Sequence, residues 1–150
     1  MEIERKYLVN QLPPNLSSYP CLHLEQAYLC TEPVIRIRRE DSSFYLTYKG
    51  SGLMVREEYN LPLNEQAYRH LLPKADGRVI AKLRYRIPLS DDPECLVAEL
   101  DVFQGELAPL VLVEVEFPSE EAALSFTPPS WFGEDVTFTS AYHNSTLSRR

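Results

Sequence analysis

The sequence lacks the cysteine and histidine patterns of a disulfide framework or a zinc site. Its three cysteines, Cys21, Cys30 and Cys95, are odd in number and contain no CxxC spacing. We therefore expect free thiols in a reducing compartment. The three histidines are scattered along the chain and form no HxxxH-type pair, so no zinc site is predicted.

Long apolar runs, internal repeats and an excess of positive charge are also missing. No run approaches the ~20 apolar residues of a membrane helix, and the Met1-Glu2-Ile3-Glu4 start is unlike a secretory signal. We expect a cytoplasmic protein with no membrane partner. The net charge of −7 argues against nucleic-acid binding. The 150 residues are enough for one domain, 1–150, with a single core.

Short segments that alternate between apolar and polar residues dominate the chain. This pattern predicts strands at about 2–9, 24–30, 34–40, 43–49, 54–61, 79–88, 96–103 and 110–117. Asn64 is expected to cap a helix to about Leu72, and Ser119 one to about Phe126, with a weaker helix in 140–150. The fold class is mainly β (α+β), as a closed antiparallel barrel or a sandwich.

Charged residues occupy one face of nearly every predicted strand, because successive residues point to opposite sides. Eight are basic and seven acidic: Lys6, Arg36, Arg38, Lys49, Arg56, Lys82, Arg84, Arg86, Glu2, Glu4, Glu58, Glu99, Asp101, Glu114 and Glu116. For any one strand, the simpler interpretation is that this face meets solvent. Full charges on seven segments favour a second interpretation, in which the charged faces line the inside of a barrel.

A barrel interior with both signs of charge suits a polyanion held together with cations. Unpaired buried charges are prohibitive, so such an interior needs water and compensating ions. One arginine can bind two phosphate oxygens at once, in a bidentate contact. Carboxylates suit a hard cation such as Mg²⁺ that bridges to phosphates. The pattern therefore predicts a phosphate-rich small molecule with divalent metal.

Ordered motifs along the chain are similar to those of a known family. They are Glu2-Ile3-Glu4-Arg5-Lys6 (ExExK), Gln26-Ala27-Tyr28-Leu29, Arg36-Ile37-Arg38, Leu46-Thr47-Tyr48-Lys49-Gly50, Arg56-Glu57-Glu58-Tyr59, Lys82-Leu83-Arg84-Tyr85, Glu99-Leu100-Asp101-Val102-Phe103, Glu114-Val115-Glu116-Phe117 and Pro129-Ser130-Trp131-Phe132-Gly133. Over about residues 1–137 the chain resembles the CYTH superfamily, the triphosphate tunnel metalloenzymes. It looks most similar to the short bacterial inorganic tripolyphosphatases. The resemblance implies a closed eight-stranded antiparallel barrel, or tunnel, with a few helices packed outside.

The resemblance also implies a role for each motif residue. Glu2 and Glu4, with Glu116 or Glu114, would hold one Mg²⁺ or Mn²⁺ ion. Glu58, with help from Glu114 or Glu116, would support a second ion that activates water. Lys82 would lie near the reacting phosphate, in substrate positioning or proton transfer. Tyr28 would support the site or contact substrate. The phosphate-binding residues would be Lys6, Arg36, Arg38, Lys49, Arg56 and Arg84.

The C-terminal segment departs from the family pattern. Members often carry an acidic residue and an arginine in an R-Y-x-N tail, where this chain has Ser140-Ala141-Tyr142-His143-Asn144. The missing arginine puts in doubt any substrate contact or tunnel-closing salt bridge from this segment. Asp135 replaces the usual glutamate before Val136.

The predicted activity is metal-dependent hydrolysis of the terminal phosphate of inorganic tripolyphosphate or a related triphosphate. Alternatives are a class IV-type adenylyl cyclase, a thiamine triphosphatase, or a non-catalytic polyphosphate-binding module. No Ser, Cys or His arrangement suggests a covalent intermediate. We expect no nucleic-acid or membrane partner, and the sequence leaves a homodimer open.

Glu4→Gln is expected to abolish metal-dependent turnover without unfolding the protein, because Glu4 lies on the acidic face beside Lys6. Phosphate release from tripolyphosphate with Mg²⁺ and the circular dichroism spectrum measure the two effects. Wild-type turnover by the folded variant would contradict the assignment of Glu4.

Overall fold

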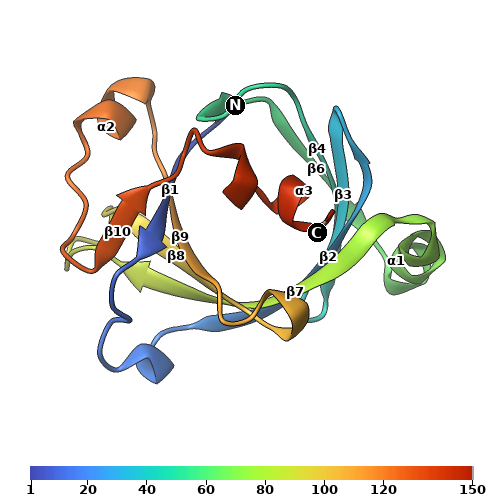
Figure 1. Ribbon diagram of the computed structural model, residues 1–150, viewed down its shortest axis with the longest axis horizontal. Coiled ribbons are helices and arrows are strands. Elements are labelled where there is room, and N and C mark those ends of the chain that lie inside the picture. The colour runs from blue at the N-terminus through green and yellow to red at the C-terminus, as the bar shows by residue number, and fades with distance from the viewer. Residues whose placement is uncertain (150) are drawn as a thin grey trace.

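Ten strands, each antiparallel to its neighbours, form one sheet that curls into a nearly closed barrel (Figure 1). The protein is described by a computed structural model that covers residues 1–149. The strands are β1 (Glu2–Val9), β2 (Cys21–Thr31), β3 (Val34–Glu40), β4 (Ser43–Lys49), β5 (Val55–Arg56), β6 (Glu58–Leu63), β7 (Asp76–Pro88), β8 (Val97–Phe103), β9 (Val111–Glu116) and β10 (Phe132–Asp135). Their order in the sheet is β10-β1-β9-β8-β7-β2-β3-β4-β6, and β5 also pairs with β1.

The barrel closes through β5. It pairs with the start of β1, where Glu2 lies opposite Arg56, and only Glu57 separates it from β6. Counted together, β5 and β6 fill one position, and eight positions then form the ring. The predicted strand 54–61 therefore breaks at Glu57, where the chain passes from β1 to β4.

The tenth strand was not predicted. β10 is four residues long, too short for alternation to be recognised, and it pairs with the second half of β1. The predicted eight-stranded barrel is confirmed as an architecture, but the strand count differs because of β10 and the β5–β6 break. Strands β2 and β7 begin three residues earlier than predicted, at Cys21 and Asp76, because they pair with each other over most of their length.

Two helices pack outside the barrel, as predicted. Helix α1 (Glu65–Leu71) is capped by Asn64, whose Oδ1 accepts from the Ala67 amide at 2.7 Å. Helix α2 (Glu120–Ser125) is capped by Ser119, whose Oγ accepts from Ala122. Figure 1 shows both helices on the outer surface. Single-turn 3₁₀ helices are η1 (Leu16–Ser18), η2 (Leu72–Lys74), η3 (Gly105–Leu107) and η4 (Ser140–Tyr142).

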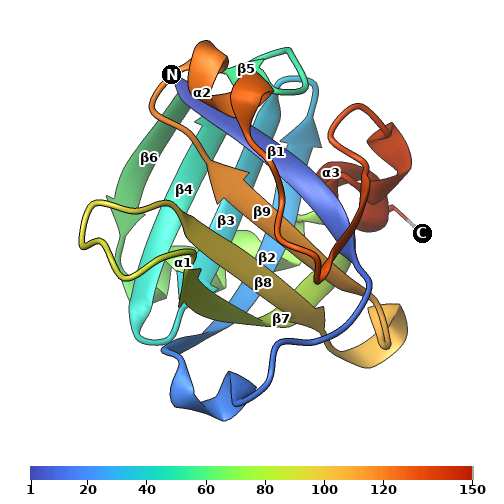
Figure 2. The same ribbon diagram turned by 90° about the vertical axis from the view of Figure 1, so that its left-hand side faces the viewer.

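The third helix lies across one end of the barrel, not on its outside. Helix α3 (Asn144–Leu147) follows η4, and Figures 1 and 2 place both at that end. Leu147 is fully buried against an apolar cluster whose other members are Tyr28, Val34, Ile80, Phe103 and Leu112. The expectation that helices pack outside is therefore wrong for α3, because the strands also carry apolar residues on their inner faces at this end.

A close backbone approach anchors the C-terminal segment to β7. The Arg78 amide donates to the Ser148 carbonyl at 2.7 Å, and the Arg78 guanidinium donates to the Leu147 carbonyl. Gly77 has a φ of +69°, and a Cβ at this position would collide with the Ser148 carbonyl. A glycine is thus required where α3 meets the sheet.

The largest hydrophobic core lies on the outer face of the barrel. Leu100, Val113 and Val115 are fully buried there, together with Tyr7 of β1 and Ala123 of α2. Their strand neighbours Asp101 and Glu114 point to the inside, because side chains alternate along each strand. The interpretation that charged rows face inward is confirmed.

Leu100→Ala is expected to lower the free energy of unfolding by about 2–5 kcal/mol, because it leaves a cavity in this outer core. Leu124, on α2, is 71% exposed, and Leu124→Ala should change stability by less than about 0.5 kcal/mol. Urea denaturation measures both. Equal stability of the two variants would mean that the outer face is not a packed core.

Candidate active site

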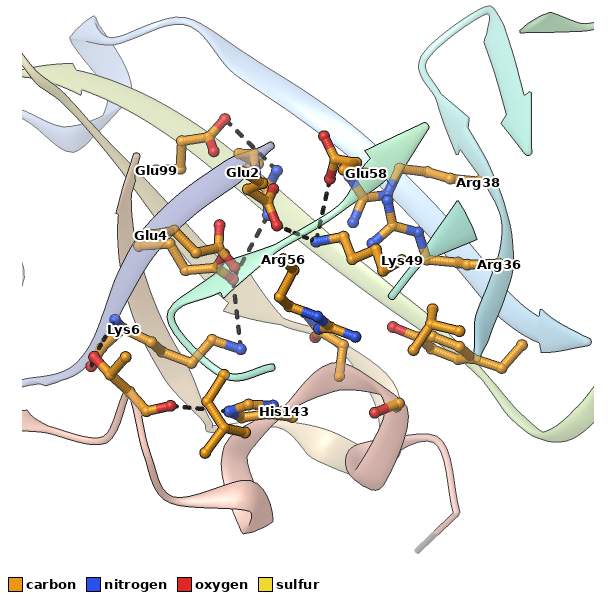
Figure 3. Close-up of a pocket in the computed structure, with 18 residues that line it drawn as sticks. Glu2, Glu4, Lys6, Arg36, Arg38, Lys49, Arg56, Glu58, Glu99 and His143 are labelled. Atoms are coloured by element: carbon orange, nitrogen blue, oxygen red, sulfur yellow. Dashed lines mark hydrogen bonds and ion pairs between the residues drawn. The ribbon is translucent and has the colours of Figure 1, made fainter. Parts of the chain in front are cut away.

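The inward-facing charged rows surround a cavity in the barrel (Figure 3). It has about 700 Å³ of space free of protein atoms, part of it open to solvent. Eleven predicted site residues line it: Glu2, Glu4, Lys6, Tyr28, Arg36, Arg38, Lys49, Arg56, Glu58, Arg84 and Glu114. Glu116 lines an adjoining pocket that shares Glu2, Arg36 and Arg38 with the cavity. The rows predicted to converge therefore do converge.

Strand β3 supplies a cationic wall. The Arg38 guanidinium donates from Nε and Nη2 to the Gln26 amide oxygen, at 2.9 and 2.6 Å. Arg36 donates from Nη2 to Thr47 Oγ1 at 3.3 Å, while its buried Nε has no hydrogen-bond partner within residues 1–149. Both side chains are more than 90% buried. This wall thus offers positive charge whose main partners are neutral.

Lys49 of β4 connects the carboxylates of Glu2 on β1 and Glu58 on β6. Its Nζ lies 2.9 Å from Glu2 Oε1 and 3.3 Å from Glu58 Oε2. Burial raises the pKa of Glu2 to about 7 in spite of Lys49. Burial and the neighbouring Glu114 and Glu2 carboxyls raise the pKa of Glu4 well above its usual value. The carboxyl groups of β1 and β9 form an acidic wall opposite β3. These groups are crowded and compete for protons.

Lys6 connects the acidic wall to the C-terminal segment. Its Nζ lies 3.6 Å from Glu114 Oε1 and donates to the Tyr142 carbonyl at 3.1 Å. Burial by itself would raise the pKa of Glu114, but Lys6, Arg84 and Lys82 hold it well below the usual range. Glu114 is therefore a carboxylate of this wall that stays charged.

A buried ionic cluster lies behind the cavity at Asp101. Arg84 binds its two carboxylate oxygens with Nε and Nη2, at 2.8 and 2.9 Å, and Lys82 Nζ lies 2.8 Å from Oδ2. Lys82 is fully buried and is not among the residues that line the cavity. Burial lowers the pKa of Lys82 to about 7, against the attraction of Asp101. A lysine of this kind can exchange a proton near neutral pH.

Several residues that line the cavity were absent from the predicted site. Glu99 was recognised only as part of a charged row, and Val34 and Leu53 are apolar. The remaining four come from the C-terminal part of the chain: Thr137, His143, Asn144 and Ser145. The ring Nε2 of His143 lies 3.1 Å from the Thr137 carbonyl, and burial lowers the pKa of the ring. Asn144 Oδ1 accepts from Lys82 Nζ at 3.4 Å. The tail thus reaches the cavity without the arginine whose loss cast doubt on that contact.

A metal-ligand arrangement is not preformed in the described chain. Within residues 1–149, no three Asp, Glu, His or Cys side chains converge at the spacing of a metal site. The predicted ligands instead contact basic side chains, Glu2 and Glu58 through Lys49 and Glu114 through Lys6. The described residues also form no helix that is long and apolar enough to span a membrane.

The fold and the site define a class of protein: a β-barrel whose interior holds a cavity between cationic and acidic walls. The family model of the CYTH domain matches residues 1–127. The chain belongs to the CYTH domain family.

Relatives that align over nearly their full length carry the name inorganic triphosphatase. The protein from Nitrosomonas europaea is 42% identical over 151 aligned positions, covering 98% of this chain and 96% of the relative. The protein from Acetivibrio thermocellus is 32% identical, covering 97% and 92%. A crystal structure of an inorganic triphosphatase matches with a TM-score of 0.71 and 38% identity, over 100% of this chain and 95% of the other.

Asp101→Asn is expected to lower the free energy of unfolding by about 3–5 kcal/mol at pH 6, because Lys82 and Arg84 would stay buried without their shared counter-charge. The loss should be smaller at pH 9. Lys82, with a folded-state pKa of about 7, is then already neutral in the wild-type protein and has no ion pair to lose.

Urea denaturation at the two pH values measures the difference, with the exposed Asp91→Asn as the control of equal charge change. Equal losses at pH 6 and pH 9 would show that Lys82 does not titrate between them.

Proposed function

We propose that this chain hydrolyses the terminal phosphoryl group of inorganic tripolyphosphate, or of a closely related triphosphate, with the help of divalent metal. One observation carries the proposal: Arg36 and Arg38 face the carboxylates of β1 and β9 across one cavity (Figure 3). The relatives named inorganic triphosphatase, aligned over nearly their full length, support it.

The cationic wall is suited to phosphate oxygens. Arg36 has a buried Nε without a partner in residues 1–149, and such a donor costs free energy unless an acceptor reaches it. Arg56 uses its Nε on the Gly50 carbonyl, which aims the rest of the guanidinium into the cavity. We assign phosphate binding to Lys6, Arg36, Arg38, Lys49, Arg56 and Arg84, with Tyr28 beside them.

The acidic wall fits a divalent cation by its chemistry. Burial first, and neighbouring carboxyl groups second, raise the pKa values of Glu2 and Glu4, and a bound cation would favour their charged forms. Partial burial, Glu58 and Glu99 raise the pKa of Glu116 in the same way. Glu2, Glu4 and Glu114 would hold one Mg²⁺ or Mn²⁺ ion, and Glu58 and Glu116 a second. When bound, such ions neutralise phosphate charge and activate water.

The chain's own residues would orient the attacking water and hold or release a proton. Phosphoryl transfer demands positioning and charge stabilisation more than covalent chemistry. Glu58 is held by Lys49 at 3.3 Å, where it can orient a water molecule. Lys82, with a pKa near 7, can hold or release a proton behind the reacting phosphate. We therefore propose Glu58 as the catalytic residue and Lys82, which does not line the cavity, as a residue that supports it from behind. We expect the enzyme to work in the cytoplasm without nucleic-acid or membrane partners.

Purified protein is expected to release phosphate from tripolyphosphate at least about tenfold faster than from ATP or thiamine triphosphate, a difference of about 1.4 kcal/mol in transition-state free energy. Parallel reactions with Mg²⁺, Mn²⁺ or excess chelator, each also assayed for cyclic AMP, measure it. Cyclic AMP formation would support a cyclase. Tight binding of tripolyphosphate without phosphate release under any condition would support a binding module instead.

A further inference from the structure

Two arginines inside the barrel are held in the same way by partners of different charge. Arg38 on β3 uses Nε and Nη2 to bind the Gln26 amide oxygen, at 2.9 and 2.6 Å. Arg84 on β7 uses the same two nitrogens to bind the Asp101 carboxylate, at 2.8 and 2.9 Å. Both guanidinium groups are therefore fixed, but only Arg84 is neutralised by the residue that fixes it.

Gln26 is positioned to act through Arg38 and not on a ligand directly. It lies on β2 opposite Arg38 in the register, is fully buried, and does not line the cavity. Arg38 does line the cavity. Burial and the neighbouring Arg36 and Arg84 lower the pKa of Arg38 only to about 10, so it is a cation at neutral pH. The carboxylate that pairs with it, Glu40, is 3.5 Å away and partly exposed.

The amide of Gln26 lowers the stability of the fold. Its Nε2 is buried and has no hydrogen-bond partner within residues 1–149, and a buried donor left unpaired is destabilising. A glutamate of the same shape would offer the same oxygen to Arg38, would add a charge partner, and would have no unpaired donor. What the amide preserves, and the carboxylate would remove, is the net positive charge of Arg38.

We propose that Gln26 is a positioning residue that fixes the Arg38 guanidinium at the cavity wall while leaving its charge available to a substrate phosphate. Gln26 thereby sets the affinity for tripolyphosphate, whereas the Asp101 carboxylate neutralises Arg84, which then offers less net charge to a phosphate than Arg38 does. The inference rests on the proposed function in one respect, the identity of the anion.

The test is Gln26→Glu, which keeps the shape of the side chain and neutralises Arg38. We expect the KM for tripolyphosphate to rise about tenfold or more, the loss of one charge-assisted contact to phosphate, with kcat within about threefold. The thermal midpoint should stay equal or rise, because the unpaired donor is gone and an ion pair is added. A structural role alone would not lower affinity while preserving stability.

Two further variants act as controls. Gln66→Glu makes the same charge change on the exposed surface of α1 and should keep the wild-type KM. Gln26→Met removes the acceptor without adding charge. It should raise KM less than Gln26→Glu does and should lower the thermal midpoint, so it keeps the inference testable if the glutamate variant does not fold.

Combination with Arg38→Ala tests whether Gln26 acts through Arg38. Arg38→Ala alone should weaken tripolyphosphate binding, and adding Gln26→Glu should then change KM by less than about twofold, because coupled residues are not additive. A wild-type KM in Gln26→Glu or in Gln26→Met would overturn the inference. An equal effect of Gln26→Glu with and without Arg38 would overturn it too.

A binding measurement separates this inference from the proposed function. Calorimetric titration of each variant with tripolyphosphate reports affinity whether or not phosphate is released. If the wild-type protein binds tripolyphosphate but does not hydrolyse it, the hydrolase proposal fails and the predicted loss of affinity in Gln26→Glu still stands. If the wild-type protein and Gln26→Glu bind tripolyphosphate with the same affinity, the role of Gln26 is refuted, whatever their activity.

Discussion

The whole molecule depends on placing the charged face of each strand inside the barrel and the apolar face outside. Buried charges are tolerated only when each meets an opposite charge or a hydrogen-bond partner. The structure satisfies this demand by sharing partners: Lys49 lies between Glu2 and Glu58, and Asp101 lies between Arg84 and Lys82. The helices outside follow from the same constraint, since the outward apolar faces must be covered.

The sequence was sufficient to predict the rows and their direction, because side chains of a strand alternate with a period of two residues. It was not sufficient to predict what covers each end. Leu147 reaches the inward-facing apolar residues Ile80 and Leu112, and alternation identifies faces without telling where along a strand the inner face changes from charged to apolar. For the same reason Lys82, on the correct face, lies behind the cavity instead of lining it.

Several of the residues that sequence reasoning missed act on other side chains. Gln26 and Asp101 had appeared only within a motif or a charged row, yet they decide which arginine carries free charge. The Tyr142 carbonyl and Asn144 contact Lys6 and Lys82 from a segment that departs from the family pattern. Such contacts depend on three-dimensional proximity between distant segments, and no local pattern of residues encodes them.

Net charge at each wall connects the architecture to the chemistry. If every cation were paired as Arg84 is with Asp101, the cavity would be neutral and would hold a polyanion weakly. If the carboxylates were absent, the anion would bind, but nothing would favour a metal complex over the free anion. The barrel instead combines cations with neutral partners on β3 and crowded carboxyls on β1 and β9. A triphosphate bearing divalent metal matches both walls at once, and this match is the physical reason to expect that substrate and metal bind together.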